Sequence, residues 1–202
     1  MERIETIRKK LHELIVKDTE FKIFCAEKSW NGHEYKLNPC LTISGIKKFE
    51  KNLNIELPKE YKEFLTTIAN GGAGPCYGLY DLNYGISCQA RYFDEKDQKP
   101  NIFLAPFPYS NKEVLSKIDD SKTIIDDNIE IFEKKHPTTG LIFLSEYGCG
   151  GYYVLVVNGE QYGKVWFYHS DGFLNPCCIK GKQLKFFDWY EYWLKTSLDS
   201  LK

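Results

Sequence analysis

The residues best suited by type and spacing to do chemistry are a cysteine in a glycine-rich turn and two histidines. Cys149 lies in the segment 148–151, which reads Gly-Cys-Gly-Gly. A thiolate in such a turn could act as a nucleophile if His136 or His169 served as its base. The surrounding sequence has no cysteine-protease signature, and a tight turn between strands explains the same glycines. We therefore expect Cys149 to be a turn residue, with a small cysteine-dependent hydrolase as an alternative.

Metal and phosphate chemistry are not favoured by the spacing of the candidate ligands. No histidine stands at ligand spacing from another or from a cysteine, the four being His12, His33, His136 and His169. A phosphate loop opens a helix, whereas the glycines in 71–78 follow an expected helix. The end of a helix carries the negative pole of its dipole, which repels phosphate. We expect no metal, no nucleotide and no other cofactor.

The strongest charge feature is an acidic stretch over residues 119–133. A single lysine, Lys122, stands against six acids, which gives a net charge of −5: Asp119, Asp120, Asp126, Asp127, Glu130 and Glu133. Such a stretch is usually a solvated face. It could also dock a basic partner, such as a nuclease, and accelerate association by electrostatic steering. These six acids are the candidate partner-binding residues.

Composition indicates an ordinary folded domain. The chain has 202 residues, 43% hydrophobic and 27% charged, and its 27 Lys+Arg nearly balance its 28 Asp+Glu. Without a global basic field, direct nucleic-acid binding is disfavoured. We expect no transmembrane helix and no secretory signal, because no apolar run is long enough and no apolar segment follows the first basic residues. The seven cysteines form no C-x-x-C pair, which fits reduced thiols and a cytoplasmic location.

Hydrophobic periodicity predicts helices on both sides of a strand-rich block. The clearest helix runs from Pro58 to Ile68, because its apolar residues recur at positions 0, 3, 4 and 7 between a proline and Asn-Gly-Gly. Residues 78–91 are expected to form short strands or extended connections. Further helices are expected over 3–17, 111–118 and 184–198. Another helix is expected to begin after Ser44, which would act as its N-terminal cap.

A β-meander is predicted between residues 140 and 168. Apolar runs over 141–144 and 152–157 and a third strand over 163–168 are separated by glycine turns. Helices, then strands, then a closing helix favour a single-domain α+β fold with an antiparallel β-sheet flanked by helices.

Together these elements resemble the SUKH superfamily over residues 43–196. The resemblance rests on a proline-started helix closed by glycines, on the strands that follow, and on an aromatic last helix; its residues include Leu57, Pro58, Tyr61, Phe64, Leu65, Asn70, Gly71, Gly72, Trp166, Trp189 and Trp193. The superfamily includes fungal regulators of cell-wall synthesis and many bacterial immunity proteins of polymorphic toxin systems. It implies a SUKH-like α+β fold without catalysis and without a required cofactor.

The resemblance implies a protein-binding module. We expect a cytoplasmic immunity protein that binds and neutralises a cognate toxin, for example a nuclease, and that itself binds neither nucleic acid nor membrane. A regulatory scaffold of the cell-wall-synthesis-regulator type is the alternative. Residues 1–42 are expected to form an N-terminal helix and extension, and 43–202 the SUKH-like domain. The extension and an insert around 84–110 could carry partner specificity.

Overall fold

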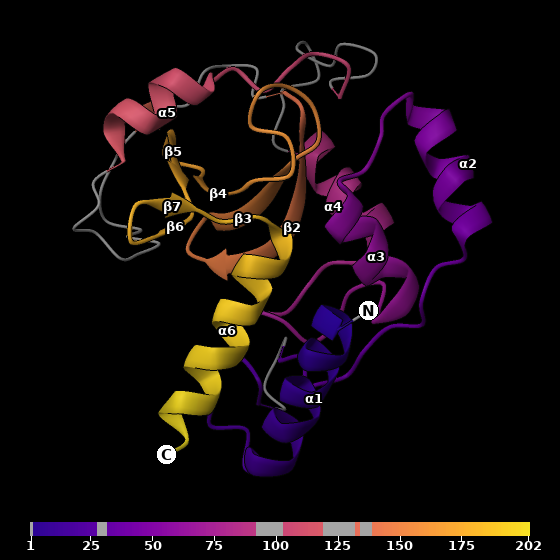
Figure 1. Ribbon diagram of the computed structural model, residues 1–202, viewed down its shortest axis with the longest axis vertical. Helices are drawn as coiled ribbons and strands as arrows, with labels where there is room; N and C mark the ends of the chain where they lie inside the picture. The colour runs from indigo at the N-terminus through magenta and orange to yellow at the C-terminus, as the bar shows by residue number, and fades with distance from the viewer. Residues whose placement is uncertain (1, 28–31, 92–102, 119–131, 134–138) are drawn as a thin grey trace.

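Figure 1 shows the computed structural model, which describes residues 2–27, 32–91, 103–118, 132–133 and 139–202. The helices in these residues are α1 (Glu2–Lys17), α2 (Ile43–Leu53), α3 (Lys59–Thr67), α4 (Leu82–Arg91), α5 (Asn111–Lys117) and α6 (Phe186–Ser200). The strands are β1 (Phe132–Glu133), β2 (Leu141–Gly148), β3 (Gly151–Val156), β4 (Val165–His169), β5 (Phe173–Pro176), β6 (Cys178–Ile179) and β7 (Lys182–Gln183).

The central sheet is antiparallel and, among the described strands, has the order β1-β5-β4-β3-β2. In its middle Val154 lies opposite Trp166, and Tyr153 lies opposite Phe167. Strands β6 and β7 form a separate hairpin that leads into α6. The predicted meander and the predicted single-domain α+β fold are therefore confirmed.

Helices or loops cover both faces of this sheet, because alternate side chains of a strand point to opposite sides. The face with Tyr153 and Phe167 packs into one hydrophobic cluster with α1, α3 and α6. The face with Val154 and Trp166 packs against α5 and the segment before it. Burial on both sides explains why the strands read as continuous apolar runs rather than as alternating patterns.

The helix predicted from the 0, 3, 4, 7 spacing is confirmed as α3, with its apolar side chains in the core. Phe64 packs its ring against Phe186 and Tyr190 of α6, with centroids 5.2 and 5.0 Å apart. The Tyr190 hydroxyl donates a hydrogen bond to the carbonyl oxygen of Ala73, 2.9 Å away. The helix predicted over 3–17 is confirmed as α1, which buries Ile7 and three further apolar side chains in the same cluster.

Two local predictions are wrong. Residues 82–91 form helix α4 rather than strands or extended chain, because the Asp81 carboxylate accepts hydrogen bonds from the N–H groups of Asn83 and Tyr84 and so starts a helix. The second error is the cap of α2. The helix begins two residues earlier, after Thr42, whose hydroxyl oxygen accepts a hydrogen bond from the N–H of Gly45 at 3.0 Å.

The glycines after α3 join distant segments and form a turn, as expected. Gly72 has a φ of 104°, and a Cβ there would clash with the carbonyl oxygen of Lys36. Isolated bridges pair Gly72 with Leu37 on one side and with Leu79 on the other, and Leu79 in turn pairs with Ser145 of β2. The turn therefore connects the N-terminal segment to the edge of the sheet.

A buried polar cluster lies at the C-terminal end of α1. Asp18 accepts hydrogen bonds from the Tyr35 hydroxyl at 2.5 Å and from the backbone N–H groups of Lys22 and Ile23. Burial alone would raise the pKa of Asp18, but these donors lower it. His33 Nδ1 accepts a hydrogen bond from the Tyr35 N–H at 3.0 Å, so the neutral ring carries its proton on Nε2. Burial lowers the pKa of His33 from 6.5 to about 4, although the charge of Asp18 opposes the shift.

This cluster predicts a loss of stability in mild acid. The unfolded chain takes up a proton at His33 near pH 6.5 and the folded chain only near pH 4, so the free energy of unfolding falls as pH is lowered through this window. We expect a loss of up to about 3 kcal/mol from His33. His33→Gln can still accept the Tyr35 N–H but cannot be protonated, so it should lack this loss in urea unfolding. The same pH dependence in both proteins would contradict the assignment.

Candidate protein-binding site

Most of the predicted partner-binding acids lie outside the described residues. This holds for Asp119, Asp120, Asp126, Asp127 and Glu130. Glu133 lies in β1, where it pairs with Phe173 of β5 at one end of the described strand order. The C-terminal end of the acidic stretch therefore joins the sheet beside β5.

The cysteine considered as a nucleophile lies in the exposed turn between β2 and β3. Cys149 has a φ of 51°. His169 is near this turn, since a Cβ on Gly150 would lie 3.9 Å from its Cε1. However, His169 Nδ1 accepts a hydrogen bond from the Asp171 N–H at 3.1 Å, which leaves the proton of the neutral ring on Nε2. In the described part of the chain no hydrogen bond joins Cys149 to an imidazole; His136 lies outside that part.

Within the described ranges, no group of three or more histidine, cysteine or acidic side chains is arranged to hold a metal ion. No helix in those ranges has the length and apolar character needed to span a membrane. The side chains of the glycine-closed helix and the aromatic last helix are used in packing. Phe64, Trp166 and Trp189 are fully buried, so they define the core and leave recognition to other residues.

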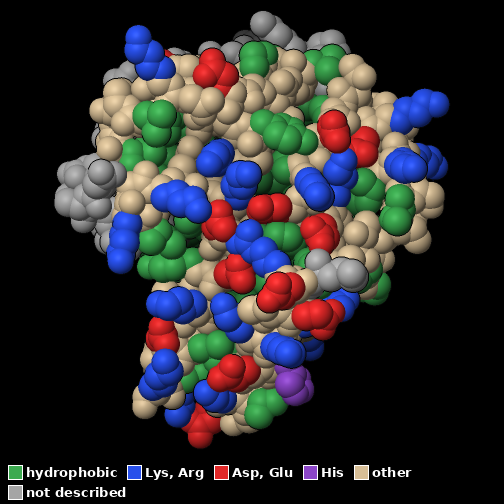
Figure 2. Space-filling model, viewed as in Figure 1, with side chains coloured by type: hydrophobic (Ala, Val, Ile, Leu, Met, Phe, Trp, Pro, Cys, Tyr) green, Lys and Arg blue, Asp and Glu red, His purple; other side chains and the backbone are tan. Residues whose placement is uncertain are grey.

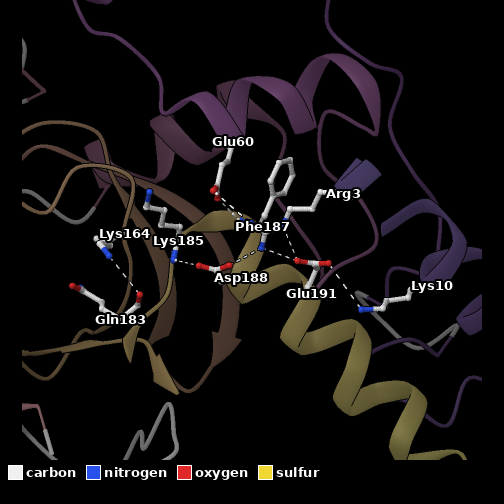
Figure 3. Close-up of polar contacts among 9 residues, drawn as sticks. All are labelled: Arg3, Lys10, Glu60, Lys164, Gln183, Lys185, Phe187, Asp188 and Glu191. Carbon is white, nitrogen blue, oxygen red and sulfur yellow. Dashed lines mark hydrogen bonds and ion pairs between the residues drawn. The ribbon is translucent and has the colours of Figure 1, made fainter. Parts of the chain in front are cut away.

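A cluster of ion pairs joins α1, α3 and α6 on the face shown in Figure 2, and Figure 3 shows it in detail. Arg3 Nη2 donates to Asp188 Oδ1 at 2.6 Å, and Arg3 Nε donates to Glu191 Oε2 at 2.8 Å. Glu60 of α3 lies 3.7 Å from Arg3 and accepts the backbone N–H of Phe187 at 3.0 Å. Charged side chains from three helices therefore meet around one guanidinium.

The cluster acts as a clamp at the start of α6. The Arg3 guanidinium also lies over the Phe187 ring, 5.3 Å from its centre. Burial alone would raise the pKa of Asp188, but the hydrogen bond and charge of Arg3 outweigh it and lower that pKa. Carboxylates at a helix N-terminus are also favoured by the helix dipole. The arrangement orients α1 on α6 and offers no reacting group.

A groove of about 320 Å³ runs along α6 from Trp189 to Ser200. Trp189, Tyr192, Trp193, Thr196, Ser197 and Ser200 form its helical wall, and residues 22–24 and 75–76 form the opposite wall. At its rim Phe24 is 64% exposed, and its ring contacts that of Tyr77. Exposed aromatic side chains are typical of surfaces that bind other proteins.

An α+β architecture with these buried motif residues defines a SUKH-type domain. The chain belongs to the SMI1 / KNR4 family (SUKH-1), whose family model matches residues 40–178. No curated protein matches the chain. The match includes α2 to β5, whereas α1, β7 and the whole of α6 lie outside it.

Sequence reasoning missed the features that depend on tertiary contacts. Arg3 and Asp188 are 185 residues apart in the sequence, so no local pattern could connect them. Phe24 lay in a segment without clear periodicity. The only signal available for Arg3 was a basic residue in the first turn of a helix, where carboxylates are preferred. This placement suggests that a tertiary partner holds the side chain.

Replacing Arg3 should weaken the clamp. Because Arg3 is 40% exposed, solvent screening limits its contribution, and we expect Arg3→Gln to lower the free energy of unfolding by about 1–2 kcal/mol at neutral pH. The pKa of Asp188 is lowered in the folded state, so this difference should shrink as acid protonates the carboxylates. Urea unfolding of wild type and Arg3→Gln at neutral pH and at acidic pH measures this difference. Lys9→Gln removes an exposed charge from the same helix and should stay within about 0.5 kcal/mol of wild type. Equal effects of the two substitutions would contradict the clamp.

Proposed function

We propose that the protein is a cytoplasmic immunity protein that binds a cognate toxin domain, for example a nuclease, and blocks it without catalysis. The observation that carries this proposal is the SUKH-1 family match over residues 40–178. SUKH proteins are associated with protein–protein interactions. In this reading, residues 1–42 are an N-terminal helix and extension of a SUKH-like domain over residues 43–202.

Blocking requires coverage of the toxin's site and exclusion of its substrate. An interface of about 1,600 Å² is a usual size for a stable protein complex. A core buried on both faces of the sheet makes the binding surface rigid, so little conformational entropy is lost on association. Because the family's motif side chains are core residues, the partner is recognised by side chains outside the motif.

The function is tested by co-expression with a toxin encoded beside it. The protein should restore growth and form a stoichiometric complex with the toxin. Cys149→Ser should protect equally well, because the proposed mechanism uses no nucleophile. Lost protection by this variant at an unchanged melting temperature would favour the hydrolase alternative. Failure to bind any neighbouring toxin, together with specific retention of cell-wall-synthesis proteins, would favour the regulatory scaffold.

We further propose that the acidic stretch contacts the toxin. Many toxins that act on nucleic acid need a basic surface to approach phosphate, and an acidic segment complements such a surface. Replacing Asp126, Asp127 and Glu130 with Asn, Asn and Gln should slow association with the toxin. The salt dependence of the association rate should also become weaker.

Stopped-flow mixing at several salt concentrations measures both effects. Glu56, Glu160 and Asp199, which are exposed acids outside residues 1–42 and 84–110, provide a matched control when they are replaced with Gln, Gln and Asn. Equal association rates for wild type and the 126/127/130 variant would remove the acidic stretch from the interface without contradicting the immunity function.

A further inference from the structure

Basic side chains gather over the β6–β7 hairpin and the start of α6, as Figure 2 shows beside the interleaved charges of the clamp. We call the group Lys164, Lys180, Lys182 and Lys185 the lysine patch. Lys180, Lys182 and Lys185 are exposed, and Lys164 is half-buried. In the described part of the chain none of the four forms an ion pair, whereas Lys10, Lys17 and Lys62 each have a carboxylate partner.

The fold places two lysines of the patch directly opposite each other. Lys164 and Lys185 are opposite each other in an isolated antiparallel bridge, an arrangement in which two cations repel. Within the described ranges, the Lys164 ammonium has one hydrogen-bond acceptor, the backbone carbonyl oxygen of Gln183 at 3.5 Å (Figure 3). Burial lowers the pKa of Lys164, and the charges of Lys185 and Lys182 lower it further, while Asp188 opposes them. The positive charges therefore converge on one place.

Among the described residues, the carboxylate of Asp188 beside the patch is already engaged elsewhere. Asp188 is engaged by Arg3 at 2.6 Å and also accepts the backbone N–H of Lys185. Glu60 and Glu191 belong to the same clamp. These three carboxylates are thus held by the helices, and within the described residues no carboxylate pairs with the four lysines.

The backbone that carries the patch is fixed. The Val165 N–H donates to the carbonyl oxygen of Leu184 at 3.0 Å, and the Leu184 N–H donates to that of Cys177 at 2.7 Å. Leu184 itself is buried in the core. A partner that binds here meets a backbone already in place, so the entropy lost on binding is limited to that of the lysine side chains.

We propose that the lysine patch is a docking surface for an acidic segment of a partner protein. This rests on the proposed protein-binding function but concerns a different surface from the acidic stretch. Carboxylates complement the four ammonium groups in sign. A nucleic acid fits less well, because the patch is short and is bordered by the carboxylates of Glu60, Asp188 and Glu191, which repel a continuing phosphate backbone.

The isolated chain and a hexaglutamate peptide test the proposal. In a low-salt NMR titration, backbone amide shifts should concentrate at residues 164 and 180–188. Replacing Lys180, Lys182 and Lys185 with Glu should weaken the affinity by about tenfold or more. Replacing Lys47, Lys48 and Lys51 of α2 with Glu makes the same change in net charge elsewhere, and should leave the affinity within about twofold of wild type. Should charge reversal unfold the hairpin, Gln at the same three positions should still weaken binding.

Two results would overturn the proposal. One is equal weakening by the patch variant and the α2 variant, which would mean attraction to overall charge. The other is tighter binding of heptathymidylate, which carries the same number of charges, at the same residues; this would assign the patch to nucleic acid. No toxin is used, so a failure here leaves the immunity function standing, and a failure of the protection experiment leaves this titration interpretable.

Discussion

The central sheet must be covered on both faces, and most other features of the structure follow from this constraint. Tyr153 and Phe167 face one way and Val154 and Trp166 the other, and all four side chains are buried. One face packs into a cluster with α3 and α6, which α1 joins by packing against α6, and the other face packs against α5 with its preceding segment. Large aromatic side chains fill the space between the sheet and its covering helices, so these side chains are not available to bind a partner. Recognition is left to hairpins, turns and the outer faces of helices.

Local patterns predicted the elements whose stability is decided locally. Pro58, the apolar spacing through Phe64 and the following glycines specified α3 without any tertiary information. Helix α4 was missed because its main local signal is a single cap, Asp81, and because Gly85 inside it is a poor helix former. Gly85 is nevertheless required by packing, since a Cβ there would clash with the carbonyl oxygen of Phe143.

The candidate site was less predictable than the fold. Lys164 and Lys185 become neighbours through a bridge between distant segments, and Arg3 finds Asp188 across nearly the whole chain. Charge in the sequence therefore pointed to residues 119–133, where it is locally dense, and not to the patch, where folding concentrates it. Spacing rules describe one helix or strand at a time, whereas surfaces are assembled from several.

The short ladder beside β2 has a consequence for how a partner can be bound. Leu79 pairs with Ser145, the N–H of Tyr80 donates to the carbonyl oxygen of Leu144 at 2.8 Å, and α4 lies along the same strand. The hydrogen-bonding groups of this edge are thus already in use over the middle of β2. Addition of a foreign strand, a common route both to complexes and to aggregation, is blocked there. At this edge, a partner can recognise the protein only through the side chains that the protein presents, because the backbone groups are already paired.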